Sequence, residues 1–207
     1  MDRNDEDLDC GWEIENPEHS IIFEKAKPLL KTRSNALHTR ISYHFAITLL
    51  EKVGGDPKIV IPAILLHDIG WSIIPESQHA EAFGPYVKKP ELQRLHETEG
   101  ARMAGEILTD LEYSGHQIHE IEEIISGHDT RSDSLNSNDS IVKDADKLWR
   151  YSYEGFTTDY KRFEKTPRDC LIWLIESISK WFFTEVAKIL AHKEVLQRKA
   201  NYGIELD

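Results

Sequence analysis

Hydrophobic residues recur at three- and four-residue spacing along most of the chain, and the two-residue alternation typical of β-strands is nearly absent. The segment 38–53 shows the pattern clearly, with Ile41 and Leu49 on one helical face before Gly54 and Gly55 end it. Further helical patterns occupy 92–111, 116–126, 140–151 and 167–199, the last as one long helix. A chain of 207 residues with this patterning predicts a compact, single-domain, all-α bundle.

One apolar run, 59–66, could by itself be a strand. Its proline and alanine, and the helices on both sides, favour a buried helix. The stretch 71–90 contains three prolines and a glycine and predicts an irregular connection. The polar stretch 131–139 predicts a loop that ends at a helix-capping residue.

The first 18 residues carry eight acidic side chains and one basic one, which amounts to −7 of the net charge of −12. We expect an acidic N-terminal tail over 1–18, followed by the domain over 19–207. The alternative is that this segment packs over the domain through Trp12 and Ile14.

The overall acidity argues against an extended nucleic-acid surface, because phosphate backbones require clustered Lys and Arg. A small phosphorylated molecule remains compatible, since one local cationic site or a metal can hold it. No segment is long and apolar enough to cross a bilayer, and the N-terminus lacks the apolar run of a signal peptide. The two cysteines are far apart and form no CxxC motif. We therefore expect a cytoplasmic protein without a membrane partner.

Histidines and aspartates form an ordered series in which each member lies on or beside a different predicted helix. Helical bundles build metal sites in this way, from inward-facing ligands of several helices. Imidazole and carboxylate ligands without thiolates suit manganese, iron, cobalt, nickel or zinc. The series offers more ligands than one ion binds alongside substrate and water. Two ions that share a bridging carboxylate would use all of these ligands. Its members are His38, His67, Asp68, His96, His128 and Asp146.

The surrounding motifs resemble those of the HD-domain superfamily of metal-dependent phosphohydrolases, over roughly residues 34–200. The motifs occur in the order of that family, and the second is the most specific. They are HTRISYHFAITLLEKVG from residue 38, AILLHDIG from 63, LHETEGARMAGEIL from 95, IEEIISGHD from 121 and IVKDADKL from 141.

The resemblance implies a primary metal site made by His38, His67, Asp68 and Asp146. It also implies a second ion held by Asp68, His96 and His128, with Asp68 bridging both ions and acting as the catalytic carboxylate. Two divalent ions are expected, Fe or Mn first, with Co, Ni, Zn or Mg as alternatives. Helical periodicity alone does not choose between Asp144 and Asp146. The family pattern of a small residue, Asp, any residue and Leu selects Asp146.

The implied activity is hydrolysis of a phosphomonoester or phosphodiester in a nucleotide or similar small substrate by a metal-bridged hydroxide. Many family members have Lys after the HDIG stretch, whereas this chain has Trp71. Phosphate contacts are therefore expected elsewhere, at Lys147, Arg150 and Arg131.

Two alternatives remain open at this stage. Some HD-fold proteins with a similar ligand pattern are mixed-valence di-iron oxygenases, although the 18-residue spacing from His128 to Asp146 favours the hydrolases. The other alternative is a non-catalytic metal- or ligand-binding signalling module. The aromatic-rich C-terminal helix closes the bundle and could also form a homodimer.

Overall fold

The computed structural model describes residues 11–79, 81–82 and 87–205 of the protein. These residues form α-helices and short 3₁₀ helices, without a β-strand among them. The α-helices are α1 Pro17–Ala26, α2 Asn35–Val53, α3 Pro57–Leu66, α4 Glu76–His79, α5 Pro90–Asp110, α6 Gly115–Ile125, α7 Ser137–Leu148, α8 Tyr153–Arg162, α9 Pro167–Trp181 and α10 Glu185–Tyr202. The 3₁₀ helices are η2 Lys27–Leu29, η3 Ile69–Ile73 and η4 Trp149–Tyr151. The all-α fold is confirmed.

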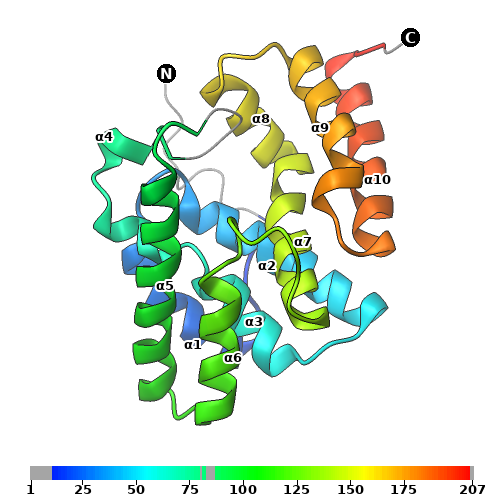
Figure 1. Ribbon diagram of the computed structural model, residues 1–207. Helices are drawn as coiled ribbons and strands as arrows, with labels where there is room; N and C mark the ends of the chain where they lie inside the picture. The colour runs from blue at the N-terminus through cyan, green and yellow to red at the C-terminus, as the bar shows by residue number, and fades with distance from the viewer. Residues whose placement is uncertain (1–10, 80, 83–86, 206–207) are drawn as a thin grey trace.

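The helices form two groups that meet at α2, α3 and α7 (Figure 1). On one side, α5 and α6 run as a pair, while α8, α9 and α10 lie on the other side. α3 packs against α1, α2, α6 and α7, and its residues from Ile59 to Leu66 are all buried. The apolar run that could be a strand is therefore the central buried helix, and its carboxyl end delivers His67 and Asp68 to the interior.

The single long helix predicted over 167–199 is wrong, because the structure has two helices there, α9 and α10. Phe182 has extended backbone angles, and Thr184 caps the start of α10 through the backbone N–H of Ala187. The buried carboxylate of Asp144 accepts hydrogen bonds from the backbone N–H groups of Phe183 and Thr184 and from the Thr184 hydroxyl. A side chain some forty residues away in sequence thus stabilises the break.

Short elements occupy parts of the chain that were expected to be irregular. The connection 71–90 contains the end of η3 and all of α4, and α8 was missed altogether. α7 begins at Ser137 with Asn136 as its cap, within the predicted loop. α4 is too short to show a helical period, whereas α8 does carry helical spacing, in Tyr153, Phe156 and Tyr160, and could have been predicted from it.

The predicted tail of residues 1–18 lies partly outside the described residues. Within them, α1 begins at Pro17 after an Asn16 cap. Trp12 donates a hydrogen bond to Glu154, and Ile14 packs against the core. These contacts agree with the alternative in which the segment packs over the domain, while the division at residue 18 stays a prediction.

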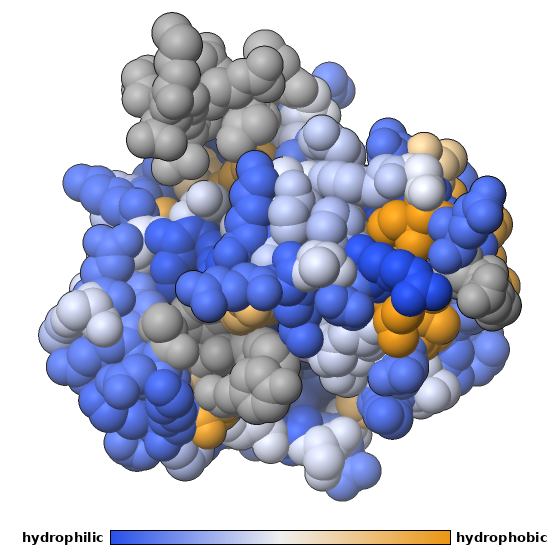
Figure 2. All heavy atoms as spheres, turned by 90° about the horizontal axis from the view of Figure 1, so that it is seen from above, coloured by the Kyte–Doolittle hydropathy of each residue, from blue (hydrophilic) through white to orange (hydrophobic). Residues whose placement is uncertain are grey.

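Hydrophilic residues cover most of the face seen in Figure 2, and hydrophobic areas gather mainly towards the side where α9 and α10 lie in Figure 1. Ile189 and Leu196 of α10 are the most exposed large apolar residues in the described part of the chain. No described helix combines the length and apolar character needed to cross a bilayer.

Candidate metal centre

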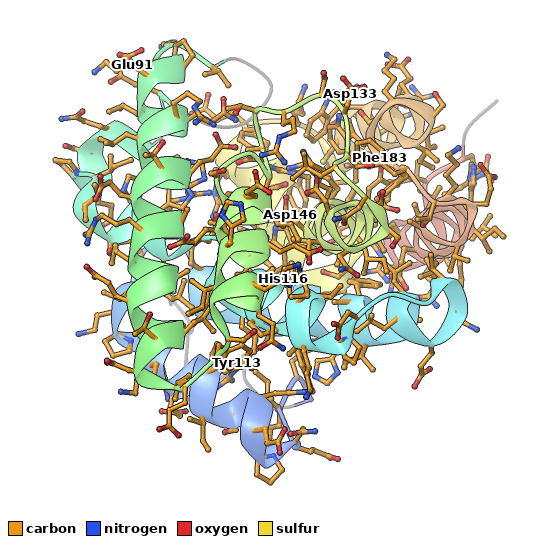
Figure 3. The ribbon with its side chains drawn as sticks, turned by 60° about the horizontal axis from the view of Figure 1, so that its bottom comes forward. Glu91, Tyr113, His116, Asp133, Asp146 and Phe183 are labelled. Atoms are coloured by element: carbon orange, nitrogen blue, oxygen red, sulfur yellow. The ribbon has the colours of Figure 1, made fainter. Side chains whose placement is uncertain are left out.

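Four of the predicted metal ligands converge at the centre of the bundle. His38 comes from the beginning of α2, His67 and Asp68 follow α3, and Asp146 lies in the last turn of α7, well inside the molecule in Figure 3. The Nε2 atoms of His38 and His67 are 2.9 Å apart, and Asp146 Oδ1 lies 3.3 and 3.6 Å from them. Asp68 Oδ2 lies 3.6 and 3.7 Å from the same two nitrogens.

A second group shares Asp68 with the first. His96 of α5 and His128, which follows α6, bring their Nε2 atoms within 3.3 Å of each other. Asp68 Oδ1 lies 3.9 Å from the His96 nitrogen and 3.7 Å from the His128 nitrogen. The two oxygens of Asp68 therefore face different pairs of histidines, which is the arrangement that a bridging carboxylate requires.

Backbone carbonyls fix the orientation of two of these imidazoles. His67 Nδ1 lies 2.8 Å from the Ile64 oxygen, and His128 Nδ1 lies 2.8 Å from the Ile125 oxygen. Because a carbonyl oxygen only accepts, each Nδ1 carries a proton, and Nε2 is the nitrogen that faces the cluster and would bind a cation once it has lost its own proton. Metal-binding histidines use this support from a neighbouring acceptor.

The spacing of the donor atoms fits a divalent cation. Metal–ligand bonds of about 2.1 Å place neighbouring donors about 3.0 Å apart in octahedral and about 3.4 Å apart in tetrahedral coordination. The separations are 2.9–3.7 Å in the first group and 3.3–3.9 Å in the second. His38, His67 and Asp68, and likewise Asp68, His96 and His128, are buried sets whose ligand atoms can reach one ion.

The charges of the cluster keep its carboxylates ionised. Burial disfavours the Asp68 carboxylate, yet the charge of His67 and a hydrogen bond from His128 hold the pKa of Asp68 well below its ordinary value. Burial also opposes protonation of His128, but Asp68 and Asp129 raise its pKa to about 9. Burial and the charge of His128 lower the pKa of His96 to about 4. Protons held by histidines of this cluster must leave when a cation binds.

Sequence reasoning missed Asp129. It belongs to a second His-Asp pair, His128-Asp129, and a dipeptide of this kind is expected to occur by chance in a chain with this many histidines and aspartates. Its Oδ2 lies 3.7 Å from His96 Nε2 and 3.8 Å from His128 Nε2, so this carboxylate is a further donor beside the second group. Its Oδ1 accepts a 2.5 Å hydrogen bond from Lys147, which also donates to Asp146 Oδ2 at 2.7 Å. Lys147 thereby joins one carboxylate of each group. The repeated dipeptide was the only signal in the sequence.

Trp71, the residue directly after the HDIG stretch, supports the cluster. Its indole N–H donates to Asp68 Oδ1 at 3.0 Å, and its ring stacks on His96 at a centroid distance of 4.2 Å. The guanidinium of Arg33 lies 4.3 Å from the centre of a Trp71 ring. Trp71 is buried, as expected for a packing role, and it also orients two of the predicted ligands.

The three predicted phosphate contacts have different surroundings. Lys147 lies within the cluster, as described above. Arg150 pairs with buried Asp159, and Arg131 pairs with Asp139 at 3.3 Å while donating to the Glu123 carbonyl. Arg131 and Lys147 also line a cavity of about 120 Å³ that includes His128 and Asp129.

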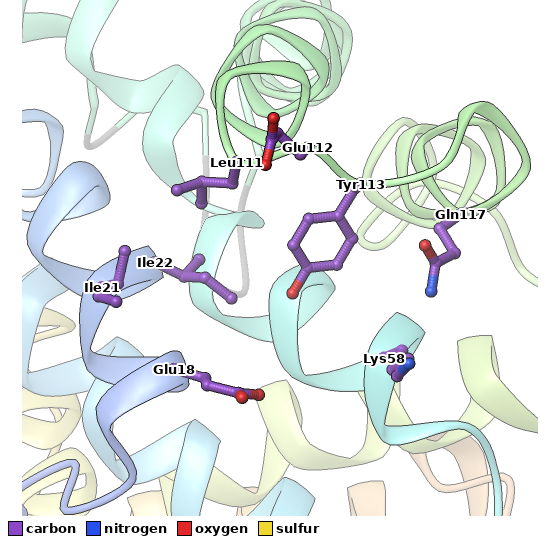
Figure 4. A pocket seen from close by; sticks show the side chains of 8 residues that line it. All are labelled: Glu18, Ile21, Ile22, Lys58, Leu111, Glu112, Tyr113 and Gln117. Carbon is purple, nitrogen blue, oxygen red and sulfur yellow. The ribbon is translucent and has the colours of Figure 1, made fainter.

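A larger cavity, of about 340 Å³, lies between α1, the start of α3 and the α5–α6 connection (Figure 4). Tyr113 points into it from the connection, and Lys58 and Glu18 face it from α3 and α1. None of the candidate metal ligands lines this cavity. Figure 3 shows Tyr113 at the far end of the helix pair from Glu91, the second residue of α5.

These features define a class, an all-α protein built around a two-part centre of histidines and aspartates. Residues 36–150 match the sequence profile of the HD domain, which is more than half of the chain. The chain therefore belongs to the HD domain family, and the resemblance inferred from its motifs is confirmed. The His/Asp cluster can accordingly hold divalent metal.

Among solved structures, the fold is similar to the crystal structure of a predicted HD superfamily hydrolase from an uncultured Thermotogales bacterium. The TM-score is 0.59, and the alignment covers 98% of this chain and 100% of that chain. The two sequences are 18% identical, so the similarity establishes the fold alone. No curated protein sequence gives a significant match.

Proposed function

We propose that the protein is a metal-dependent phosphohydrolase that cleaves a phosphomonoester or phosphodiester bond in a nucleotide or a similar small phosphorylated substrate. The observation that carries the proposal is the placement of Asp68, whose two oxygens face separate histidine pairs in a buried cluster. Membership of the HD domain family and a similar fold in a predicted HD superfamily hydrolase support it.

The chain supplies the ligands and their orientation. His38, His67 and Asp146 would hold one ion, His96 and His128 a second, and Asp68 would contact both. Bound divalent ions, Fe or Mn first, supply Lewis-acid activation of water near neutral pH and neutralise charge on a phosphoryl group. The packing of the cluster excludes bulk water, since its histidines are buried and Asp68 is only 6% exposed.

The positively charged side chains beside the cluster favour an anionic substrate. Lys147 follows Asp146 directly, Arg150 lies in η4 four residues after Asp146, and Arg131 lines a cavity together with His128. Lys147 holds Asp129 and Asp146 in place, so a bound phosphoryl group would share this cation with two carboxylates. We also propose that the substrate is met in the cytoplasm and that the C-terminal segment, α9 and α10, can form a homodimer.

A screen of phosphatase and phosphodiesterase substrates with Mn²⁺, Fe²⁺, Co²⁺, Ni²⁺ and Mg²⁺ tests the activity. We expect metal-dependent release of phosphate or nucleoside, and about two metal ions per chain by elemental analysis of anaerobically purified protein. Full activity in metal-free protein would overturn the proposal. Consumption of O₂ with a mixed-valence EPR signal would instead establish the oxygenase alternative.

The variant His96→Ala tests the division of the ligands. It removes a donor from the second group only, so occupancy of that site should fall while binding at His38 and His67 persists. His119→Ala is the matched control, because the side chain of His119 is 74% exposed on α6, where it lies beside Glu123 and not beside a candidate ligand. Equal loss at both sites in His96→Ala would contradict the division.

A further inference from the structure

The cavity of about 120 Å³ beside the second histidine group is not explained by metal binding. Its walls come from the segment after α6, from α7 and from the end of α9. At about 30 Å³ per water molecule, the space holds roughly four waters or one group of phosphate size. The lining residues are His128, Asp129, Arg131, Ser132, Lys143, Lys147, Lys180, Trp181 and Phe183.

The lining is cationic in a protein whose net charge is −12. Four of its side chains are Arg or Lys, and one is a carboxylate, Asp129. Arg131 pairs with Asp139, and Lys147 is shared by two carboxylates. The other two, Lys143 and Lys180, form no ion pair with a described residue.

Lys143 is a cation built into the wall. It is 3% exposed, and its Nζ donates to the backbone oxygens of Gly127, His128 and Arg131 at 2.8, 3.4 and 2.7 Å. Carbonyl oxygens satisfy the hydrogen-bond donors of an ammonium group without cancelling its charge. Lys180 is exposed at the end of α9, so its side chain can approach a ligand at low cost.

The cavity and the metal centre share a wall. His128 and Asp129 line the cavity; His128 belongs to the second group of donors, and Asp129 lies beside that group. Lys147 lines it as well and reaches Asp146 of the first group. A molecule with one phosphoryl group at the metal centre therefore has this cationic space directly beside it.

We propose that the cavity is an anion subsite that binds a second phosphoryl group of the substrate, next to the one held at the metal centre. The substrate class is then a compound with two neighbouring phosphoryl groups, such as a nucleoside diphosphate or triphosphate, and not a simple monoester. The inference rests on the proposed function, since it places the scissile group at the metals.

The test compares binding of pyrophosphate and inorganic phosphate to the metal-loaded protein by calorimetry at low ionic strength, with the metal content measured before and after titration. Lys180→Gln and Lys180→Glu change one exposed charge of the cavity. Lys188→Glu on α10 is the matched control, since Lys188 is absent from the lining.

We expect the wild type to bind pyrophosphate more tightly than phosphate. Lys180→Gln should weaken pyrophosphate binding about threefold and Lys180→Glu about tenfold, because they remove and reverse one partly screened charge. Phosphate binding should change less than about twofold, and the control should behave like the wild type.

Pyrophosphate binding that is no tighter than phosphate binding, or that survives Lys180→Glu with the metal content intact, would overturn the subsite and leave the proposed function standing. Failure of the metal-loaded wild type to bind either anion would overturn both. Pyrophosphate binding that falls equally in Lys188→Glu would show a general charge effect and would also refute the subsite.

Discussion

Gly70 follows the His67-Asp68 pair at the crossing of η3 and α5, and it provides a sharp test of how the centre is built. A Cβ atom placed on Gly70 would lie 1.9 Å from the backbone oxygen of His96 and 2.7 Å from the backbone nitrogen of Gly100. Both contacts are with backbone, so no flexible side chain can move away. Gly70→Ala therefore forces α5 and η3 apart.

The size of the effect follows from these distances. Real Cβ contacts are rarely shorter than 3.0 Å, so the His96 oxygen must move by at least about 1.1 Å. Overpacking of this kind costs about 3 kcal/mol, which for a chain of this length lowers Tm by about 6–12 °C. Metal–ligand distances tolerate only about 0.2 Å. Because Asp68 and His96 lie on opposite sides of the crossing, the second ion should be lost first.

The assays are thermal unfolding and elemental analysis of Gly70→Ala beside the wild type. Gly115→Ala is the control, since a Cβ on Gly115, in the first turn of α6, meets nothing within 4 Å. This control should match the wild type in metal content, and its free energy of unfolding should rise by up to about 1 kcal/mol. A Gly70→Ala protein with unchanged Tm and full metal content would refute the close approach of η3 and α5. A lowered Tm with both metals retained would refute the inference that the crossing of η3 and α5 positions the metal ligands.

Three further predictions concern other parts of the structure. Trp71→Phe keeps an aromatic ring against His96 but loses the hydrogen bond to Asp68. Metal affinity, measured in a competition titration with a chromogenic chelator, should therefore fall about tenfold. An unchanged metal affinity would contradict the supporting role of Trp71. Burial raises the pKa of the Cys170 thiol to about 12. In a Cys10→Ser background, the folded protein should therefore react with a thiol reagent about a thousandfold more slowly than the unfolded chain. The free energy of unfolding should also fall as the pH rises above about 9, because only the unfolded chain then loses the thiol proton. Rapid modification of the native protein would show an accessible thiol. Ser114→Ala removes the capping box of α6 and should lower Tm by about 2–4 °C without altering metal content, as calorimetry and elemental analysis can establish; a change in metal content would mean that this distant helix end is coupled to the centre.

The helices were predictable where the signals that define them lie within the segment itself. In α2, apolar spacing and the terminal Gly54 are both local signals, and the predicted end at Val53 agrees with the structure. α3 was harder, since an apolar run has no polar face to reveal its period. Proline and alanine within it gave the correct element type.

The contacts that shape the centre were not predictable in the same way. Asp144 and Asp146 lie on the same helix, and periodicity did not separate them. In the structure, Asp144 accepts hydrogen bonds at the start of α10, while Asp146 faces His38 and His67. The choice of Asp146 rested on the family resemblance, and its role as a ligand stays a prediction.

The sequence by itself determined the helical class, the family and the order of the histidines and aspartates, because periodicity and motifs are properties of contiguous residues. Only the tertiary structure decided that Asp68 faces two histidine groups, that Lys147 joins Asp129 to Asp146, and that Trp71 lies against His96. It also divided the C-terminal helical pattern into α9 and α10. These features depend on side chains that are distant in sequence and meet only when helices pack, so their pairing leaves no pattern along the chain.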